Sequence, residues 1–219
     1  MTDQQTPAKS RRGCLFYGCL SGTVCLLAIL LAFLIGLHQV KKMLNFFTDT
    51  HPVELPTVQM TAAQIEQLKQ RVEAFQDALR SGRPTAPLSL TSDEINAYIQ
   101  TDANLSRLKG KVYVTIEGDR LKGQVSIPLD DLGLGVFRGR YLNGSGLFVV
   151  ALRHGELIVS PEELIVKGKP LPSVYMDKAR SQNLAQNLGS NPRASVALNH
   201  LQDIKITDGK LVLLPKVEQ

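Results

Sequence analysis

The sequence predicts an α+β protein in which one N-terminal transmembrane helix is followed by an antiparallel meander sheet packed with two or three helices. Three observations favour this class. An uncharged stretch lies between Arg12 and Lys41, two later segments begin with helix-capping sequences, and from Lys111 onward apolar and polar residues alternate. Helices that precede a run of strands, without regular alternation, are typical of the α+β class.

The first twelve residues are polar and predict a disordered basic tail, and residues 13–42 predict the transmembrane helix. The uncharged stretch would extend roughly 42 Å as a helix, at about 1.5 Å per residue, which exceeds the ~30 Å hydrocarbon core of a bilayer. Its apolar region is longer than that of a secretory signal, and no small-residue cleavage pair follows it, so an uncleaved signal-anchor is favoured over a cleaved peptide. The residues expected to contact lipid tails are Leu15, Val24, Leu26, Leu27, Ile29, Leu30, Leu31, Phe33, Leu34, Ile35 and Leu37.

The basic residues gather around this helix. Residues 1–42 contain five basic residues and one acidic residue, a net charge of +4 out of +5 for the chain. This distribution suits phospholipid headgroups and argues against a nucleic-acid partner. The residues expected at the membrane interface are Arg11, Arg12, Lys41, Lys42, Phe46 and Phe47. The larger charge on the N-terminal side predicts a cytoplasmic N-terminus and a globular domain outside the cell membrane.

Cysteine and glycine positions add two expectations. All three cysteines, Cys14, Cys19 and Cys25, lie in or beside the membrane helix, so the domain has no thiol, which suits an extracytoplasmic compartment. Gly18 and Gly22 have the spacing that lets membrane helices approach closely, so a homodimer through them is one partner hypothesis.

Residues 43–60 contain Pro52 and Pro56 and predict a juxtamembrane linker, and residues 61–219 predict the globular α+β domain. Thr61 and Gln64 have the spacing of a capping box that begins a helix, and Thr91 and Glu94 repeat it. The first helix continues with an apolar stripe that is either core or a seam for a partner protein: Ile65, Leu68, Val72, Phe75 and Leu79.

Alternation with a period of two predicts the strands, with turns at Gly118-Asp119, Asn143-Gly144, His154-Gly155 and Asp208-Gly209. Residues 164–167 predict a strand of their own, Val174–Leu188 a helix, Ala194–Leu201 a helical turn, and Ile204–Leu214 a C-terminal hairpin. One aliphatic face of the first strands is expected either to bind an apolar ligand or to pack as core: Val112, Val114, Ile116, Leu121, Val125 and Ile127.

Catalytic patterns are missing from the sequence. The four histidines, His38, His51, His154 and His200, do not have metal-ligand spacing, and neither a nucleophile elbow nor a phosphate-binding loop is present. We therefore expect no catalytic residue, no metal and no cofactor, and a domain that is not an enzyme.

Several segments resemble a known group of proteins. LTSDEINAYI, LQDIKITDGKLVLLP and GRYLNGSGLFVVALRHGELIVSP followed by VKGKPLP are similar to segments of small membrane-anchored bacterial proteins of the YpmS type. The resemblance covers Leu88–Pro215. It implies a tubular lipid-binding-like domain, in which a curved sheet wraps a long helix around an apolar groove.

Two functions remain open from the sequence. The first is a membrane-anchored extracytoplasmic domain that binds lipid or another apolar ligand. The alternative is an interaction or scaffold module of an envelope protein assembly.

Overall fold

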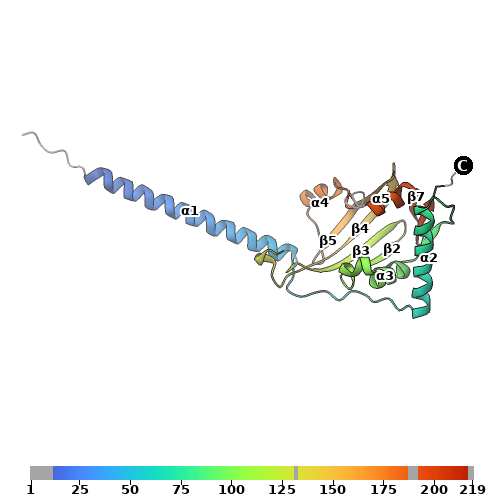
Figure 1. Ribbon diagram of the computed structural model, residues 1–219. Coiled ribbons are helices and arrows are strands. Elements are labelled where there is room, and N and C mark those ends of the chain that lie inside the picture. Colours follow the sequence, from blue (N-terminus) through green and yellow to red (C-terminus); the bar gives the residue numbers. More distant parts are fainter. Residues whose placement is uncertain (1–11, 131–132, 187–191, 217–219) are drawn as a thin grey trace, which may run out of the picture. The chain divides into compact units, whose positions relative to one another are not determined.

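The computed structural model describes residues 12–130, 133–186 and 192–216, with side chains described from Ile29 onward and, in the last range, from Ser195. The chain divides into two compact units, Met1–Phe46 and Phe47–Gln219. The described part of the first unit is the helix α1, Arg12–Phe47, which runs on into the first residue of the second unit (Figure 1).

A helix is present where the transmembrane helix is predicted, and it is longer than expected at its C-terminal end. Helix α1 continues five residues beyond residue 42, into the segment expected to be a linker. These residues contain neither Gly nor Pro, and the first proline after α1 is Pro52. The side chains from Ile29 to Val40 are exposed, including Ile29 at 67% and Phe33 at 61%. The segment Ile29–Phe47 is long and apolar enough to cross a membrane.

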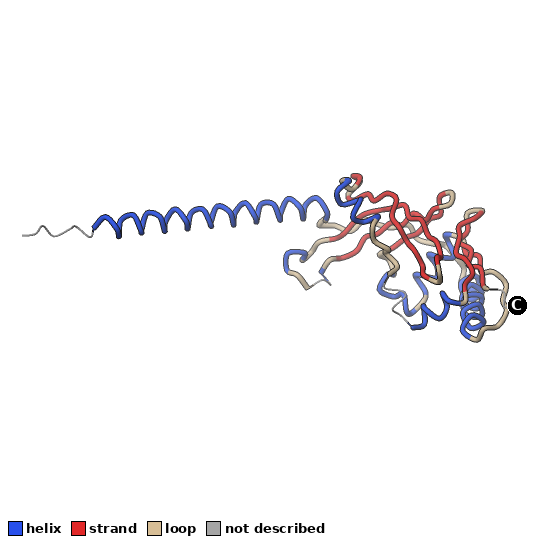
Figure 2. The backbone as a smooth tube through the Cα atoms, turned by 90° about the horizontal axis from the view of Figure 1, so that it is seen from above, coloured by secondary structure: helices blue, strands red, loops and turns tan. Residues whose placement is uncertain are grey.

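The second unit confirms the predicted α+β class. Its elements are α2 (Ala62–Arg80), β1 (Leu88–Leu90), α3 (Ser92–Thr101), η1 (Ala103–Leu108), β2 (Val112–Glu117), β3 (Arg120–Pro128), η3 (Gly135–Phe137), β4 (Tyr141–Arg153), β5 (Glu156–Val166), β6 (Lys169–Pro170), α4 (Ser173–Arg180), α5 (Pro192–Asn199), β7 (Leu201–Thr207) and β8 (Lys210–Pro215). Strands β2 to β6 form an antiparallel meander in chain order, and β1, β8 and β7 form a second, three-stranded sheet. Figure 2 shows the strands of the unit in red.

Both predicted capping boxes are present. The Thr61 hydroxyl accepts the Gln64 N–H, and the Gln64 side chain accepts the Thr61 N–H in return. Thr91 and Glu94 make the same exchange at the start of α3. The turns at residues 118–119, 154–155 and 208–209 are also confirmed, since each connects two paired strands. His154 and Asp208 adopt positive φ beside their glycines, as tight hairpin turns require.

The predicted turn at Asn143-Gly144 is wrong. Both residues lie inside β4, and neither adopts positive φ. The Asn143 side chain is buried and hydrogen-bonded to the segment after α1, so tertiary contacts override the local preference for a turn.

Two further predictions need correction. Residues 164–166 are not a separate strand but the end of β5, which passes a bulge opposite Leu147 and Phe148. The helix expected to reach Leu188 ends at Arg180, and Leu188 lies outside the described residues. The chain leaves the helix because Asn183 bonds to the edge of β5: its carbonyl accepts the Val159 N–H and its amide donates to Leu157 O.

The core of the second unit lies between α2, α3, α5, the three-stranded sheet and the hairpin end of β4 and β5. Its buried members are Leu68, Val72, Phe75, Leu79, Leu88, Ala97, Leu201 and Ile204. Val150, Leu152 and Leu157 pack against this cluster from the larger sheet. Helix α2 packs on β1, α3 and α5, whereas the resemblance implies a long helix wrapped by the sheet.

Candidate functional site

The most distinctive surface of the second unit is one face of the five-stranded sheet. The strand register places Val112 opposite Val125, Val114 opposite Gly123 and Ile116 opposite Leu121. Since alternate residues of a strand share a face, the same face continues onto β4 and β5. We call it the apolar face; beyond the six residues expected from the sequence it comprises Gly123, Leu142, Gly144, Gly146, Phe148, Val150, Leu152, Leu157, Val159, Pro161, Leu164 and Val166.

The apolar face is covered at its hairpin end, where Val150, Leu152 and Leu157 meet the core, and at Pro161, which is less than 2% exposed. The six residues expected from the sequence are all half-buried, and none belongs to the core cluster or to the residues packed against it. An aliphatic surface that remains partly open to solvent is typical of a site for an apolar partner.

Three glycines hollow out the middle of the apolar face. Gly123 lies opposite Gly146, and Val125 lies opposite Gly144. A Cβ added at Gly146 would come within 2.7 Å of Leu164 Cδ2 and 2.8 Å of Phe148 Cζ, and one at Gly123 within 3.2 Å of Phe148 Cε2. The Phe148 ring therefore lies across the two glycines. Beside it is a hollow of about 180 Å³ with almost wholly aliphatic walls, which include Val125, Leu142, Leu164 and Val166.

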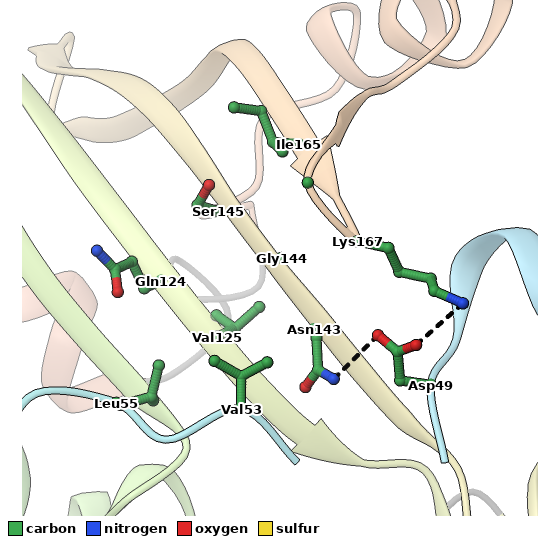
Figure 3. Close-up of a pocket in the computed structure, with 11 residues that line it drawn as sticks. Asp49, Val53, Leu55, Gln124, Val125, Asn143, Gly144, Ser145, Ile165 and Lys167 are labelled. Atoms are coloured by element: carbon green, nitrogen blue, oxygen red, sulfur yellow. Dashed lines mark hydrogen bonds and ion pairs between the residues drawn. The ribbon is translucent and has the colours of Figure 1, made fainter. Parts of the chain in front are cut away.

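The opposite face of the sheet is apolar toward the β4–β5 turn, where it carries Leu147, Val149 and Ile158. At its other end it is polar, with Gln124, Ser126 and Asn143, and this polar end carries the segment that follows α1. We call residues 48–55 the strap. Asp49 pairs with Tyr141 at the start of β4, with both backbone hydrogen bonds at 2.8 Å. The Val53 N–H donates to the Ser126 hydroxyl at 3.0 Å. A segment expected to be a loose linker is thus bound to the sheet, and a hollow of about 460 Å³ lies between the strap and Gln124, Ser145 and Ile165 (Figure 3).

Asn143 holds the strap in place. Its amide donates to Asp49 Oδ2 at 3.1 Å and to His51 O at 2.8 Å, and its carbonyl accepts the Ser126 hydroxyl at 2.9 Å. Lys167 adds an ion pair to Asp49 Oδ1 at 2.9 Å (Figure 3).

The charge state of Asp49 follows from these contacts. Burial by itself would raise the pKa of the Asp49 carboxyl. The hydrogen bonds from Lys167 and Asn143 and the positive charge of Lys167 outweigh that effect, so the pKa lies below its ordinary value. Asp49 is therefore ionised at neutral pH, as its pairing with Lys167 requires.

Both outer edges of the five-stranded sheet are occupied. Along β2, the Asn96 side chain accepts the Val114 N–H at 2.7 Å and donates to Val114 O at 2.6 Å, while the Ser92 hydroxyl accepts the Ile116 N–H. Along β5, strand β6 and the bonds from Asn183 and Arg180 cover the edge. Asn96 is 1% exposed, and its amide bonds to β2 as the backbone of a neighbouring strand would.

The other residues expected to be functional lie in different places. Of the predicted seam, Leu68, Val72, Phe75 and Leu79 are buried in the core, and only Ile65 is half-exposed. Phe47 packs edge-on against Tyr175, with ring centroids 5.3 Å apart, while Lys41, Lys42 and Phe46 are exposed. Leu15, Gly18, Gly22, Val24, Leu26, Leu27 and Arg12 lie in α1 where side chains are not described, and Arg11 lies outside the described residues.

No group of His, Cys, Asp or Glu side chains among the described residues is arranged to hold a metal ion. No family model, curated protein or solved structure matches the chain. The residues that sequence patterns did not identify are the three glycines, Phe148 and Asn143. In the sequence of β4, only the two glycines at positions 144 and 146, on the same face of the strand, mark the hollow.

Proposed function

We propose that this protein is a membrane-anchored, extracytoplasmic, non-enzymatic domain that binds lipid or another apolar ligand on the apolar face. The observation that carries the proposal is the half-exposed aliphatic surface with the hollow at Gly123, Gly144 and Gly146.

The dimensions of the apolar face support an acyl chain as the ligand. The nine residues of β3 extend about 30 Å at ~3.3 Å per residue. One leaflet contributes about half of the ~30 Å hydrocarbon core. The apolar face is therefore long enough for an extended acyl chain that lies along the strands. The hollow beside Phe148 makes the apolar face deeper where Gly123, Gly144 and Gly146 have no side chains.

Helix α1 supports the membrane location. Its apolar side chains from Ile29 to Met43 are exposed, a surface that is unfavourable in water and favourable in lipid. A tether in the bilayer would keep the apolar face close to its source of ligand. The lower positive charge after the helix than before it supports an N-terminus in the cytoplasm and a domain outside.

The alternative, an interaction module of an envelope assembly, has less support. The side chains that would form its helical seam are used by the core of the second unit, with Leu68 only 1% exposed. The apolar face remains the surface on which a protein partner would compete with lipid, and the same experiment separates the two.

The test uses the full chain in vesicles that contain a phospholipid with a photoreactive group on its acyl chain. We expect cross-links in peptides of β3, β4 and β5. Val125→Glu places a carboxylate in the hollow and should remove most of the cross-linking to these strands. Gln124→Glu is the matched control, because the neighbouring residue points to the polar face, and it should leave cross-linking unchanged.

Unfolding temperatures of both variants show whether the domain remains folded. Cross-linking that is equal in Val125→Glu and Gln124→Glu, with both variants folded, would contradict lipid binding on the apolar face. Cross-links from the apolar face to a second protein in place of lipid would favour the alternative.

A further inference from the structure

A second surface of the domain, separate from the apolar face, carries exposed apolar residues. The loop between β3 and β4 presents Leu134 at 57% exposed and Val136 at 48% exposed. These side chains flank Gly135 in η3, and Arg138, also exposed, follows. We call residues 133–138 the tip. Large apolar side chains that alternate with small residues and stand beside a cation are unfavourable in water and suit a bilayer interface.

The base of this loop is tied to the residues that directly follow α1. The Arg140 guanidinium donates to the Thr48 hydroxyl at 2.7 Å, and Tyr141 exchanges two backbone hydrogen bonds with Asp49. At the neck of the loop, Leu129 N–H donates to Arg140 O at 2.8 Å and Gly139 N–H to Asp130 Oδ1 at 2.9 Å. The tip therefore emerges from the end of the domain at which the chain enters from α1.

Other groups at this end have the same character. Val174 is 77% exposed in the first turn of α4, next to Tyr175, whose ring packs on Phe47. Arg107 and Lys111 line an open hollow beside Ile127, near the end of β3. Exposed apolar side chains interspersed with cations match a surface of lipid tails beneath phosphate groups.

We infer that the tip inserts into the headgroup region of the bilayer, so that this end of the domain rests on the membrane surface. The occupant is the bilayer and not a second protein, because the base of the tip is hydrogen-bonded to Thr48 and Asp49, the residues that directly follow α1. The inference rests on the proposed membrane insertion of α1 but not on ligand binding by the apolar face.

The test places a fluorophore in the tip of the full chain. Cys14, Cys19 and Cys25 are replaced by Ala so that a single new cysteine can be labelled. Gly135→Cys is suitable because a Cβ there meets nothing within 4 Å and both apolar neighbours remain. The protein is reconstituted in vesicles of phosphatidylcholine and phosphatidylglycerol, with and without a nitroxide on the lipid acyl chains.

Two control positions frame the measurement. The first is Val196→Cys, because Val196 lies on α5 and is 43% exposed. The end of α5 lies against the β4–β5 turn. Strand β4 runs from Tyr141, at the base of the tip, to Arg153, so its length places that turn about 40 Å from Tyr141. Phe33→Cys reports whether α1 itself is in the bilayer.

We expect nitroxide lipids to remove most of the fluorescence at Gly135→Cys and at Phe33→Cys, and little at Val196→Cys. Adding Leu134→Ser and Val136→Ser should restore most of the fluorescence at position 135. Quenching at position 135 no greater than at 196, or unchanged by the two serines, would overturn the inference while leaving the anchor intact. An unquenched Phe33→Cys would overturn the membrane anchor as well.

Discussion

Single residues decide how the polar side of the sheet is built, and Asn143 is the clearest case. Its sequence neighbours predict a turn, because Asn and Gly both tolerate positive φ. In the structure its buried amide instead joins Ser126, Asp49 and His51. The glycine that follows Asn143 is needed for a reason other than a turn. A Cβ at position 144 would lie 2.8 Å from Ile165 O. A single sequence shows the residue type but not which of these constraints applies.

Replacing Asn143 should destabilise the domain. In Asn143→Ala the Asp49 carboxylate, His51 O and the buried Ser126 hydroxyl each lose one hydrogen bond, and a polar group left unsatisfied when buried costs about 1–3 kcal/mol. We expect the free energy of unfolding to fall by about 2–3 kcal/mol in chemical denaturation. Ser145→Ala, two residues along the same face, is the control, because the described residues give its hydroxyl no hydrogen bond. A loss equal to that of the control would contradict this role.

Asp49 should make stability depend on pH on the acid side. Its pKa is lower in the folded than in the unfolded chain, so its contribution is complete above the ordinary aspartate pKa of about 4 and is lost as the pH falls further. Wild type should therefore lose more stability than Asp49→Asn between pH 5 and pH 3 (on the order of 1 kcal/mol or less, since the pair is partly solvated). Glu94 and Asp102, whose pKa values are also lowered, contribute equally to the acid loss of stability in wild type and in Asp49→Asn, so their effect cancels in the comparison. If wild type and Asp49→Asn lost the same stability between pH 5 and pH 3, this role of Asp49 would be contradicted.

At the scale of elements, helices are easier to predict than strand partners. Capping boxes and apolar spacing are local patterns, and they predict the starts of α2 and α3 correctly. Strand β1 shows the opposite case, because its three residues pair with β8, which lies more than a hundred residues later in the chain. Such long-range pairing leaves no local pattern. The early end of α4 has the same cause, a contact between Asn183 and a distant strand edge.

Helix α2 allows a test of whether its apolar stripe belongs to the core or forms a seam for a partner protein. Leu68→Ala should lower the free energy of unfolding by about 2–5 kcal/mol, because the side chain is 1% exposed and its loss leaves a cavity. Ile65→Ala, one turn earlier on the same stripe, should cost much less because Ile65 is half-exposed. Chemical denaturation of the two variants measures the difference. Equal and small losses would mean that the stripe is not part of the core.

At the scale of the whole molecule, the sequence predicts the class of fold and the aliphatic side of the sheet, but not what covers that side. Periodicity shows that Val112, Val114 and Ile116 share a face. Whether a helix packs on them depends on where α2 and α5 settle, which is decided by contacts with the second sheet. The openness of the apolar face, on which the proposed function depends, is therefore visible only in three dimensions.

The occupied sheet edges have a consequence for association. A sheet that leaves one aliphatic face uncovered would be prone to aggregate if a strand from another copy could also add to its side. Asn96 and Ser92 on β2, and Asn183 with β6 on β5, take up backbone groups that such a strand would need. Growth of the five-stranded sheet by strand addition is blocked at these positions. A ligand of the proposed kind would therefore lie on the face of the sheet and would not extend it as a further strand.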